Sequence, residues 1–153
     1  MRRSPLAAGL AVAAMLVGGT ASYAGLSSRP GSIAPEEVGV LACHVAWDAR
    51  TRSPVLDRSQ GSGCAGVTSA WVDDRGRITV RHAYNPVISI VVTPDEAAAG
   101  RGLTAGASGG GPRTMLTVSD ARVGRRLHLH TARDADRVGS GSGWWLVITQ
   151  DAR

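Results

Sequence analysis

The sequence predicts a mainly β fold: a small antiparallel β-sandwich or barrel of about seven short strands with one short helical turn, preceded by an N-terminal signal segment. Short runs of β-branched and aliphatic residues recur along the chain, and turn-forming residues separate them about every 10 residues. The chain has 153 residues, of which 43% are hydrophobic and 19% charged. This length and composition suit one globular domain, or one domain with a tail.

The N-terminus has the pattern of an export signal. Two arginines follow the initial methionine, residues 6–19 are apolar, and the small residues Ser22 and Ala24 end the segment. This order predicts a signal peptide over residues 1–24, cleaved after Ala24. The alternative is an uncleaved signal anchor, because the apolar run extended to Leu26 approaches the roughly 20 residues that span a bilayer. The anchor would be the chain's only contact with a membrane.

Beyond the signal, we expect a flexible lead over residues 25–36 and a single β-domain over residues 37–153. Residues 37–47 are apolar and β-branched, which predicts the first strand. Cys43 and Cys64 are the only cysteines. In an exported protein such a pair predicts a structural disulfide, here closing a polar loop over residues 48–63.

A β-hairpin is predicted next, with strands at residues 67–72 and 77–84. The Asp-Asp-Arg-Gly sequence at residues 73–76 supplies the turn between them. Because side chains alternate along a strand, one face of the second strand carries four side chains. These are Ile78, Val80, His82 and Tyr84.

The run Val-Ile-Ser-Ile-Val-Val at residues 87–92 predicts a central strand, because it is the most apolar stretch after the signal. A helical turn follows. Thr93 is the predicted N-cap, Pro94 suits the first helical position, Glu96 completes a capping box and Gly100 ends the helix.

The last third of the chain alternates between predicted loops and strands. Residues 100–113 are rich in glycine and are expected to form a loop, and residues 134–143 form a polar linker. Strands are expected over residues 114–118, 126–131 and 144–150.

The basic charge does not by itself indicate nucleic-acid binding. Every one of the 17 basic residues is arginine, while lysine and phenylalanine are absent and Asn85 is the only asparagine. A GC-rich genome explains this usage, and acidic residues are interleaved with the arginines. Without Arg2 and Arg3 the formal charge falls by two, from +5 to +3. The absence of lysine excludes Schiff-base chemistry and a Walker A lysine.

Histidines are the first candidates for a chemical site. His128 and His130 are separated by one residue, so on a strand their imidazoles share a face. Together with His82 on another strand, they form a candidate zinc or copper site with an open position for water. The alternative is an exposed edge strand with alternating leucine and histidine. A fourth histidine, His44, stands next to Cys43.

Two adjacent tryptophans are the other candidates. Trp144 and Trp145 lie on opposite faces of the predicted last strand, so one of them is exposed unless both faces are covered. An exposed tryptophan is typical of a binding site for protein or carbohydrate.

The leading hypothesis is a small exported protein, a non-enzymatic binding or structural module at the cell envelope or outside the cell. Trp144 and Trp145 are its candidate binding residues, its partner is a protein or carbohydrate, and it requires no cofactor. The alternative is an exported zinc- or copper-binding protein that uses His82, His128 and His130 and that could act as a metallohydrolase. No residue pattern assigns a catalytic group.

Overall fold

The computed structural model describes residues 38–59, 64–83 and 86–151, which form a mainly β domain. The predicted signal segment and flexible lead lie outside the described residues. No helix among the described residues is long and apolar enough to cross a membrane. The described elements are β1 (Val38–Asp48), β2 (Ser53–Asp57), β3 (Val67–Val72), β4 (Ile78–His82), β5 (Val87–Pro94), α1 (Glu96–Gly100), β6 (Leu103–Gly110), β7 (Arg113–Asp120), β8 (Arg125–Arg126), α2 (Ala132–Val138) and β9 (Gly143–Asp151).

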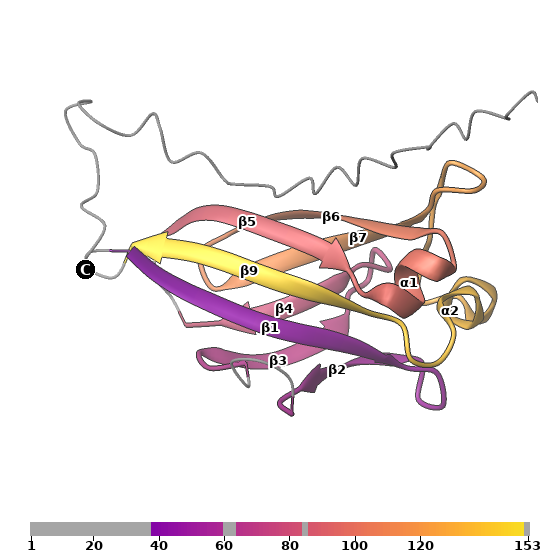
Figure 1. The fold of residues 1–153 in the computed structure, drawn as a ribbon, viewed down its shortest axis with the longest axis horizontal. Helices are drawn as coiled ribbons and strands as arrows, with labels where there is room; N and C mark the ends of the chain where they lie inside the picture. The colour runs from indigo at the N-terminus through magenta and orange to yellow at the C-terminus, as the bar shows by residue number, and fades with distance from the viewer. Residues whose placement is uncertain (1–37, 60–63, 84–85, 152–153) are drawn as a thin grey trace, which may run out of the picture. The chain divides into compact units, whose positions relative to one another are not determined.

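The strands form two antiparallel sheets. The first sheet has the order β2-β1-β9-β5 and the second has the order β3-β4-β7-β6, with β8 added beside β7. Figure 1 shows β1, β9 and β5 side by side. The two sheets are neighbours at both seams, because β2 lies next to β3 and β5 next to β6. The expectation of a small antiparallel sandwich or barrel is therefore confirmed.

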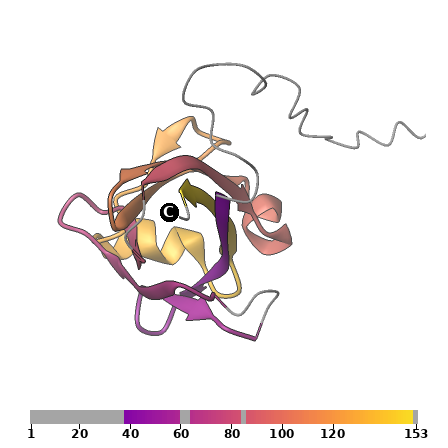
Figure 2. The ribbon, with the colours of Figure 1, turned by 90° about the vertical axis from the view of Figure 1, so that its left-hand side faces the viewer.

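The core fills the space between the sheets. Alternate residues of β1 and β9 point into it, so one face of each strand is apolar and buried. Figure 2 shows the strands surrounding this interior, and Figure 1 shows α2 at one end of it. The fully buried side chains include Val45, Trp144, Leu146 and Ile148 from the first sheet, and Ile78, Val80, Leu116 and Val118 from the second.

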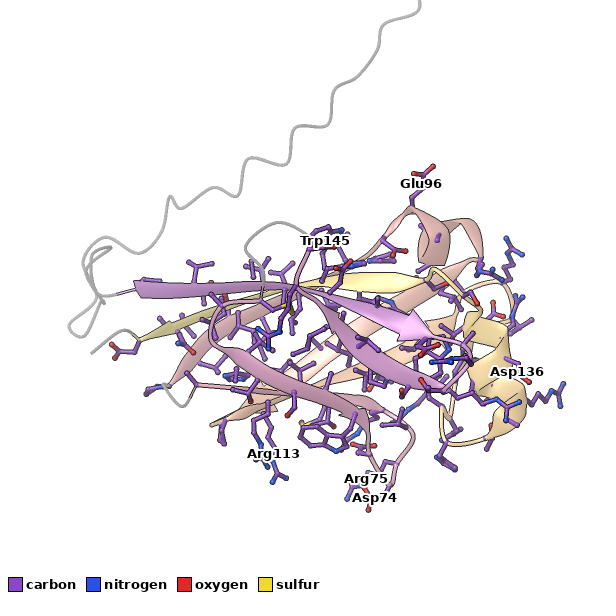
Figure 3. The ribbon with its side chains drawn as sticks, turned by 90° about the horizontal axis from the view of Figure 1, so that it is seen from below. Asp74, Arg75, Glu96, Arg113, Asp136 and Trp145 are labelled. Carbon is purple, nitrogen blue, oxygen red and sulfur yellow. A yellow bond between two sulfur atoms is a disulfide. The ribbon has the colours of Figure 1, made fainter. Side chains whose placement is uncertain are left out.

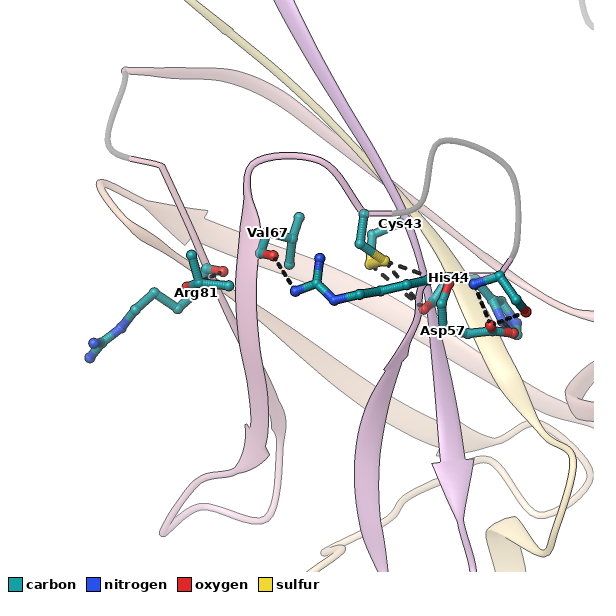
Figure 4. Close-up of a disulfide and its surroundings, with 9 residues drawn as sticks. Cys43, His44, Asp57, Val67 and Arg81 are labelled. Carbon is teal, nitrogen blue, oxygen red and sulfur yellow. Dashed lines mark hydrogen bonds and ion pairs between the residues drawn. A yellow bond between two sulfur atoms is a disulfide. The ribbon is translucent and has the colours of Figure 1, made fainter.

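The disulfide ties the middle of β1 to the turn that precedes β3. Cys43 and Cys64 are bonded, as the sequence predicts, and both are buried. Figure 4 shows this bond beside His44 and Asp57. A disulfide is typical of proteins that reside in a non-reducing environment.

The β3–β4 hairpin forms where it is predicted. The Asp73 carboxylate accepts hydrogen bonds from the backbone N–H groups of Arg75 and Arg77, and Gly76 takes a positive φ of 70°. Ile78, Val80 and His82, which were expected to share one face of the strand, are all buried. The fourth residue assigned to this face, Tyr84, lies outside the described residues.

Two segments expected to be loops contain strands. β2 forms within the polar loop at residues 48–63 and pairs with β1. The glycine-rich segment forms β6, which pairs with β7 over its full length. Leu103 is buried there, and Ala105 and Ala107 pack against the core. Alternating apolar residues, most of them small, therefore suffice for a strand that is hydrogen-bonded to β7 along its full length.

Other boundaries also differ from the prediction. The strand expected at 126–131 does not extend beyond Arg126, where β8 ends, and α2 occupies the first half of the polar linker. β5 is an edge strand of its sheet by hydrogen bonding, not a central one, and it exposes Val91. α1 is capped by Asp95 rather than Thr93, because β5 continues to Pro94 before the chain turns.

Candidate functional site

His44 lies on the outer face of the first sheet. Its neighbours in β1, Cys43 and Val45, point into the core, so the imidazole points away from it. The histidine is nevertheless only 9% exposed, because side chains from β2, β9 and the start of α1 surround it. A buried polar ring requires polar partners, and it has two.

Two aspartates contact the two ring nitrogens of His44. Its Nδ1 lies 3.3 Å from an Asp57 carboxylate oxygen, and its Nε2 lies 3.2 Å from an Asp95 carboxylate oxygen. Carboxylates only accept hydrogen bonds, so an imidazole that carries both ring protons can donate to both aspartates. The three side chains link β1, β2 and the segment before α1 into one polar unit, which we call the Asp-His-Asp unit.

The two carboxylates also have other partners. The Ser59 hydroxyl and backbone N–H, and then His44, hold the pKa of Asp57 below its usual value. One oxygen of Asp95 accepts the N–H of Ala98 at 2.7 Å and caps α1, while the other faces His44. The position of α1 is therefore coupled to the position of the imidazole.

Trp145 covers one side of this unit. It lies directly across from His44 in the β1–β9 pairing, and the two ring centroids are 4.7 Å apart. The indole is 37% exposed, and Figure 3 shows it on the outside of the domain. An open pocket of about 590 Å³ lies here, lined by His44, Asp95, Glu96, Ala97 and Trp145.

Gly143 is required for the contact between His44 and Asp95. A Cβ atom at this position would lie 2.6 Å from His44 Nε2 and 2.9 Å from the Asp95 carboxylate. Its carbonyl also accepts a hydrogen bond from the Asp95 backbone N–H. Only glycine leaves room for the imidazole and the carboxylate to meet.

Exposed valines continue from Trp145 across the same sheet face. Val147 lies two residues along β9, and Val91 of β5 is paired directly with it. Val40 of β1 is on the same face. These valines are 36%, 57% and 63% exposed, respectively. We call Trp145, Val147, Val91 and Val40 the Trp145 face. An apolar patch of this kind on a sheet exterior is a feature of interaction surfaces.

The structure separates the predicted metal ligands. His82 is buried at the end of β4, where its ring nitrogens lie 2.9 Å from the Ala83 carbonyl and 3.2 Å from the Thr114 hydroxyl. His128 and His130 lie beside Gly76, before the start of β4. Six residues of extended chain separate Gly76 from His82, which is about 20 Å.

His128 and His130 lie close to each other, with ring centroids 6.0 Å apart, and both are exposed. Leu127 and Leu129 are buried between them, as the alternating pattern predicts. Among the residues that the structure describes, no group of three or more histidine, cysteine, aspartate or glutamate side chains is arranged to hold a metal ion.

The two tryptophans occupy opposite faces of β9. Trp144 is fully buried in the core, whereas Trp145 is exposed beside the pocket. The structure therefore brings Trp145 into the candidate site and places Trp144 outside it. The sequence analysis did not assign Asp57, Asp95 or Gly143 to any site. The capping signature predicted that a helix begins near these residues, but it assigned the cap to Thr93 and Glu96 and not to Asp95.

Comparison of the chain with protein-family models, with curated proteins and with solved structures finds no match.

Proposed function

We propose that this chain is an exported, non-enzymatic binding module that acts at the cell envelope or outside the cell, and that the Trp145 face is its binding surface. The observation that carries the proposal is the half-exposed indole of Trp145, held against the buried His44 and continuous with exposed valines. A rigidly held tryptophan within an apolar patch is the kind of residue that dominates binding energy at interfaces.

The same surface favours a protein partner over a carbohydrate. Carbohydrate sites combine an aromatic ring with many hydrogen-bonding groups, whereas the outer face beyond Trp145 carries valines. The pocket side of Trp145 is acidic, with Asp95 and Glu96 along its lining. A partner that places an apolar segment on the valines and a basic side chain near the carboxylates would match both features.

Export is supported by two features of the sequence. The order of basic, apolar and small residues over residues 1–24 is that of a signal peptide. The disulfide between Cys43 and Cys64 is of the kind that persists in oxidising compartments.

Site-specific photo-cross-linking tests the binding surface. Val147→p-benzoylphenylalanine in the full chain, expressed in the producing cells, places the probe next to Trp145 without removing the indole. We expect a discrete cross-linked protein, and we expect the additional substitution Trp145→Ala to abolish it. Val123→p-benzoylphenylalanine is the matched control, because Val123 is 67% exposed and lies outside the first sheet.

Two outcomes would contradict the proposal. The first is the same set of cross-linked proteins from both probe positions, or a set that Trp145→Ala leaves unchanged. The second is a failure of the Val147 probe to capture any protein while soluble oligosaccharides quench Trp145 fluorescence, which would assign the face to carbohydrate instead.

A further inference from the structure

A second surface, on the opposite sheet, carries two arginines directly across from each other. Arg81 of β4 and Arg113 of β7 are partners in the antiparallel pairing, and both side chains are exposed. Figure 3 shows Arg113 on the other side of the domain from Trp145, and Figure 4 shows Arg81 pointing away from its strand. Like charges at directly opposed positions of a sheet repel each other and destabilise the pairing.

No carboxylate relieves this repulsion within the described part of the chain. Arg77, four residues nearer the hairpin turn than Arg81, is neutralised by Asp73 at 2.7 Å. Neither Arg81 nor Arg113 forms such an ion pair among the described residues. Instead, both guanidinium groups lie over the ring of Trp71, at 5.8 and 6.0 Å from its centroid. Because both guanidinium groups lie over the same indole, they stay on the same part of the sheet surface.

The positions that flank the arginine pair are occupied by small residues. Across β3, β4, β7 and β6 the outer row reads Ser69, Arg81, Arg113 and Gly110. A Cβ atom at Gly110 would meet nothing within 4 Å, so the space beside Arg113 is open. A hollow of about 310 Å³ adjoins Arg113, and its lining also includes Trp71, Asp73, Asp74, Arg77, Thr79 and Met115. Of its two carboxylates, that of Asp73 is paired with Arg77.

We propose that Arg81, Arg113 and Trp71 form an oxyanion-binding site, independent of the Trp145 face. Opposed residues of an antiparallel pair have Cβ atoms about 5 Å apart, so both guanidiniums can reach the oxygens of one phosphate, sulfate or carboxylate group. Binding removes the repulsion between the two cations. The Ser69 hydroxyl at the end of the row can donate a further hydrogen bond.

The test is an NMR titration of the folded chain at constant ionic strength, with chloride replaced in turn by inorganic phosphate, sulfate or acetate. We expect saturable shifts of the Arg81 and Arg113 Nε–H signals and of the Trp71 indole N–H signal, with one common dissociation constant. The anion that saturates at the lowest concentration identifies the class of oxyanion. Trp145→Ala should titrate like the wild type, which separates this site from the Trp145 face.

Four variants distinguish a two-arginine site from general attraction of anions to a basic protein. R81A and R113A should each weaken binding at least about tenfold, because a charge-assisted bidentate contact is lost. R113K should also weaken anion binding, because lysine keeps the positive charge but lacks the planar guanidinium that donates two parallel hydrogen bonds. R50A removes an exposed arginine elsewhere and should leave the constant unchanged. Shifts that increase linearly without saturation, or equal constants for R81A and R50A, would overturn the proposal.

Discussion

The imidazole of His44 and the indole of Trp145 are stacked at a tilt, with ring centroids 4.7 Å apart on adjacent strands. One ring is buried among carboxylates and the other is exposed beside a pocket. The Asp-His-Asp unit therefore acts as the support that fixes Trp145. Contact with the buried imidazole restricts the orientations open to the indole, which would reduce the entropy lost if Trp145 binds a partner as proposed.

Removal of the imidazole should destabilise the domain. H44A leaves Asp57 and Asp95 partly buried and facing each other without the ring that both contact. We expect a loss of about 2 kcal/mol in the free energy of unfolding, measured by urea denaturation. The double variant H44A/D57N removes one of the two charges and should recover part of the loss. No change in H44A, or a further loss in the double variant, would refute a supporting role.

A methyl group at Gly143 should disrupt the same unit from within. G143A places a Cβ atom 2.6 Å from His44 Nε2, so the contact with Asp95 has to break. We expect a loss of about 1–3 kcal/mol in stability and altered ¹⁵N shifts of the His44 ring. G106A is the control, because Gly106 lies in β6 with nothing within 4 Å of the added atom. Equal effects of the two substitutions would show that Gly143 has no special part in the site.

Reduction of the disulfide should weaken the whole domain. Cys43 and Cys64 are 21 residues apart, and closing a loop of that length contributes roughly 3 kcal/mol through the lost entropy of the unfolded chain. Urea denaturation with and without reductant measures the difference. The variant C43A/C64A should match the reduced protein and should not respond to reductant. A reduced protein as stable as the oxidised one would contradict this expectation.

Acid should destabilise the domain through Asp134, which anchors α2. The Arg125 guanidinium lowers the pKa of Asp134 below its ordinary value of 3.8, against the opposing effect of burial, and the His128 N–H adds to the lowering. A carboxyl with a lower pKa in the folded protein stabilises the fold above the unfolded value, and this contribution disappears as the pH falls through the folded value.

We therefore expect the free energy of unfolding to decrease as the pH falls below about 4. D134N should be less stable than the wild type at neutral pH and should show a weaker decrease in acid. D136N, at an exposed position on the same helix, is the matched control for the loss of one carboxylate. A D134N profile parallel to that of the wild type would assign the acid sensitivity to other groups.

The sequence predicted those parts of the fold whose cause lies in residues close together along the chain. The β-branched run around Cys43, the Asp73–Gly76 turn and the alternation of leucines with His128 and His130 all have a local physical cause. The strands missed by the sequence analysis depend on pairing instead. β6 consists largely of small residues, and its backbone bonds to β7 stabilise it. α2 forms because Thr131 caps it and one side of the helix meets the core.

The site itself depends on register, which the sequence does not display. Asp57 and Asp95 are 13 and 51 residues from His44 along the chain. The pairing of β1 with β2 brings Asp57 to His44, and the pairings of β9 with β1 and β5 bring Asp95 to it. The exposure of one residue of the Trp144–Trp145 pair followed from strand alternation. Alternation alone does not say which of the two points into the core. Trp144 does so because its strand pairs with β1 on the side where Cys43 and Val45 are buried.

The most direct test of the account is the affinity of the partner captured by the Val147 probe, measured by calorimetry against wild-type chain, W145A and W71A. Trp71 is the matched control, because it is a partly exposed tryptophan on the other sheet. A central aromatic anchor contributes at least about 2 kcal/mol, so W145A should weaken binding about 30-fold. W71A should change it less than about twofold, as expected for a residue outside the interface. Equal losses for the two variants, or wild-type affinity in W145A, would contradict the assignment of the Trp145 face as the binding surface.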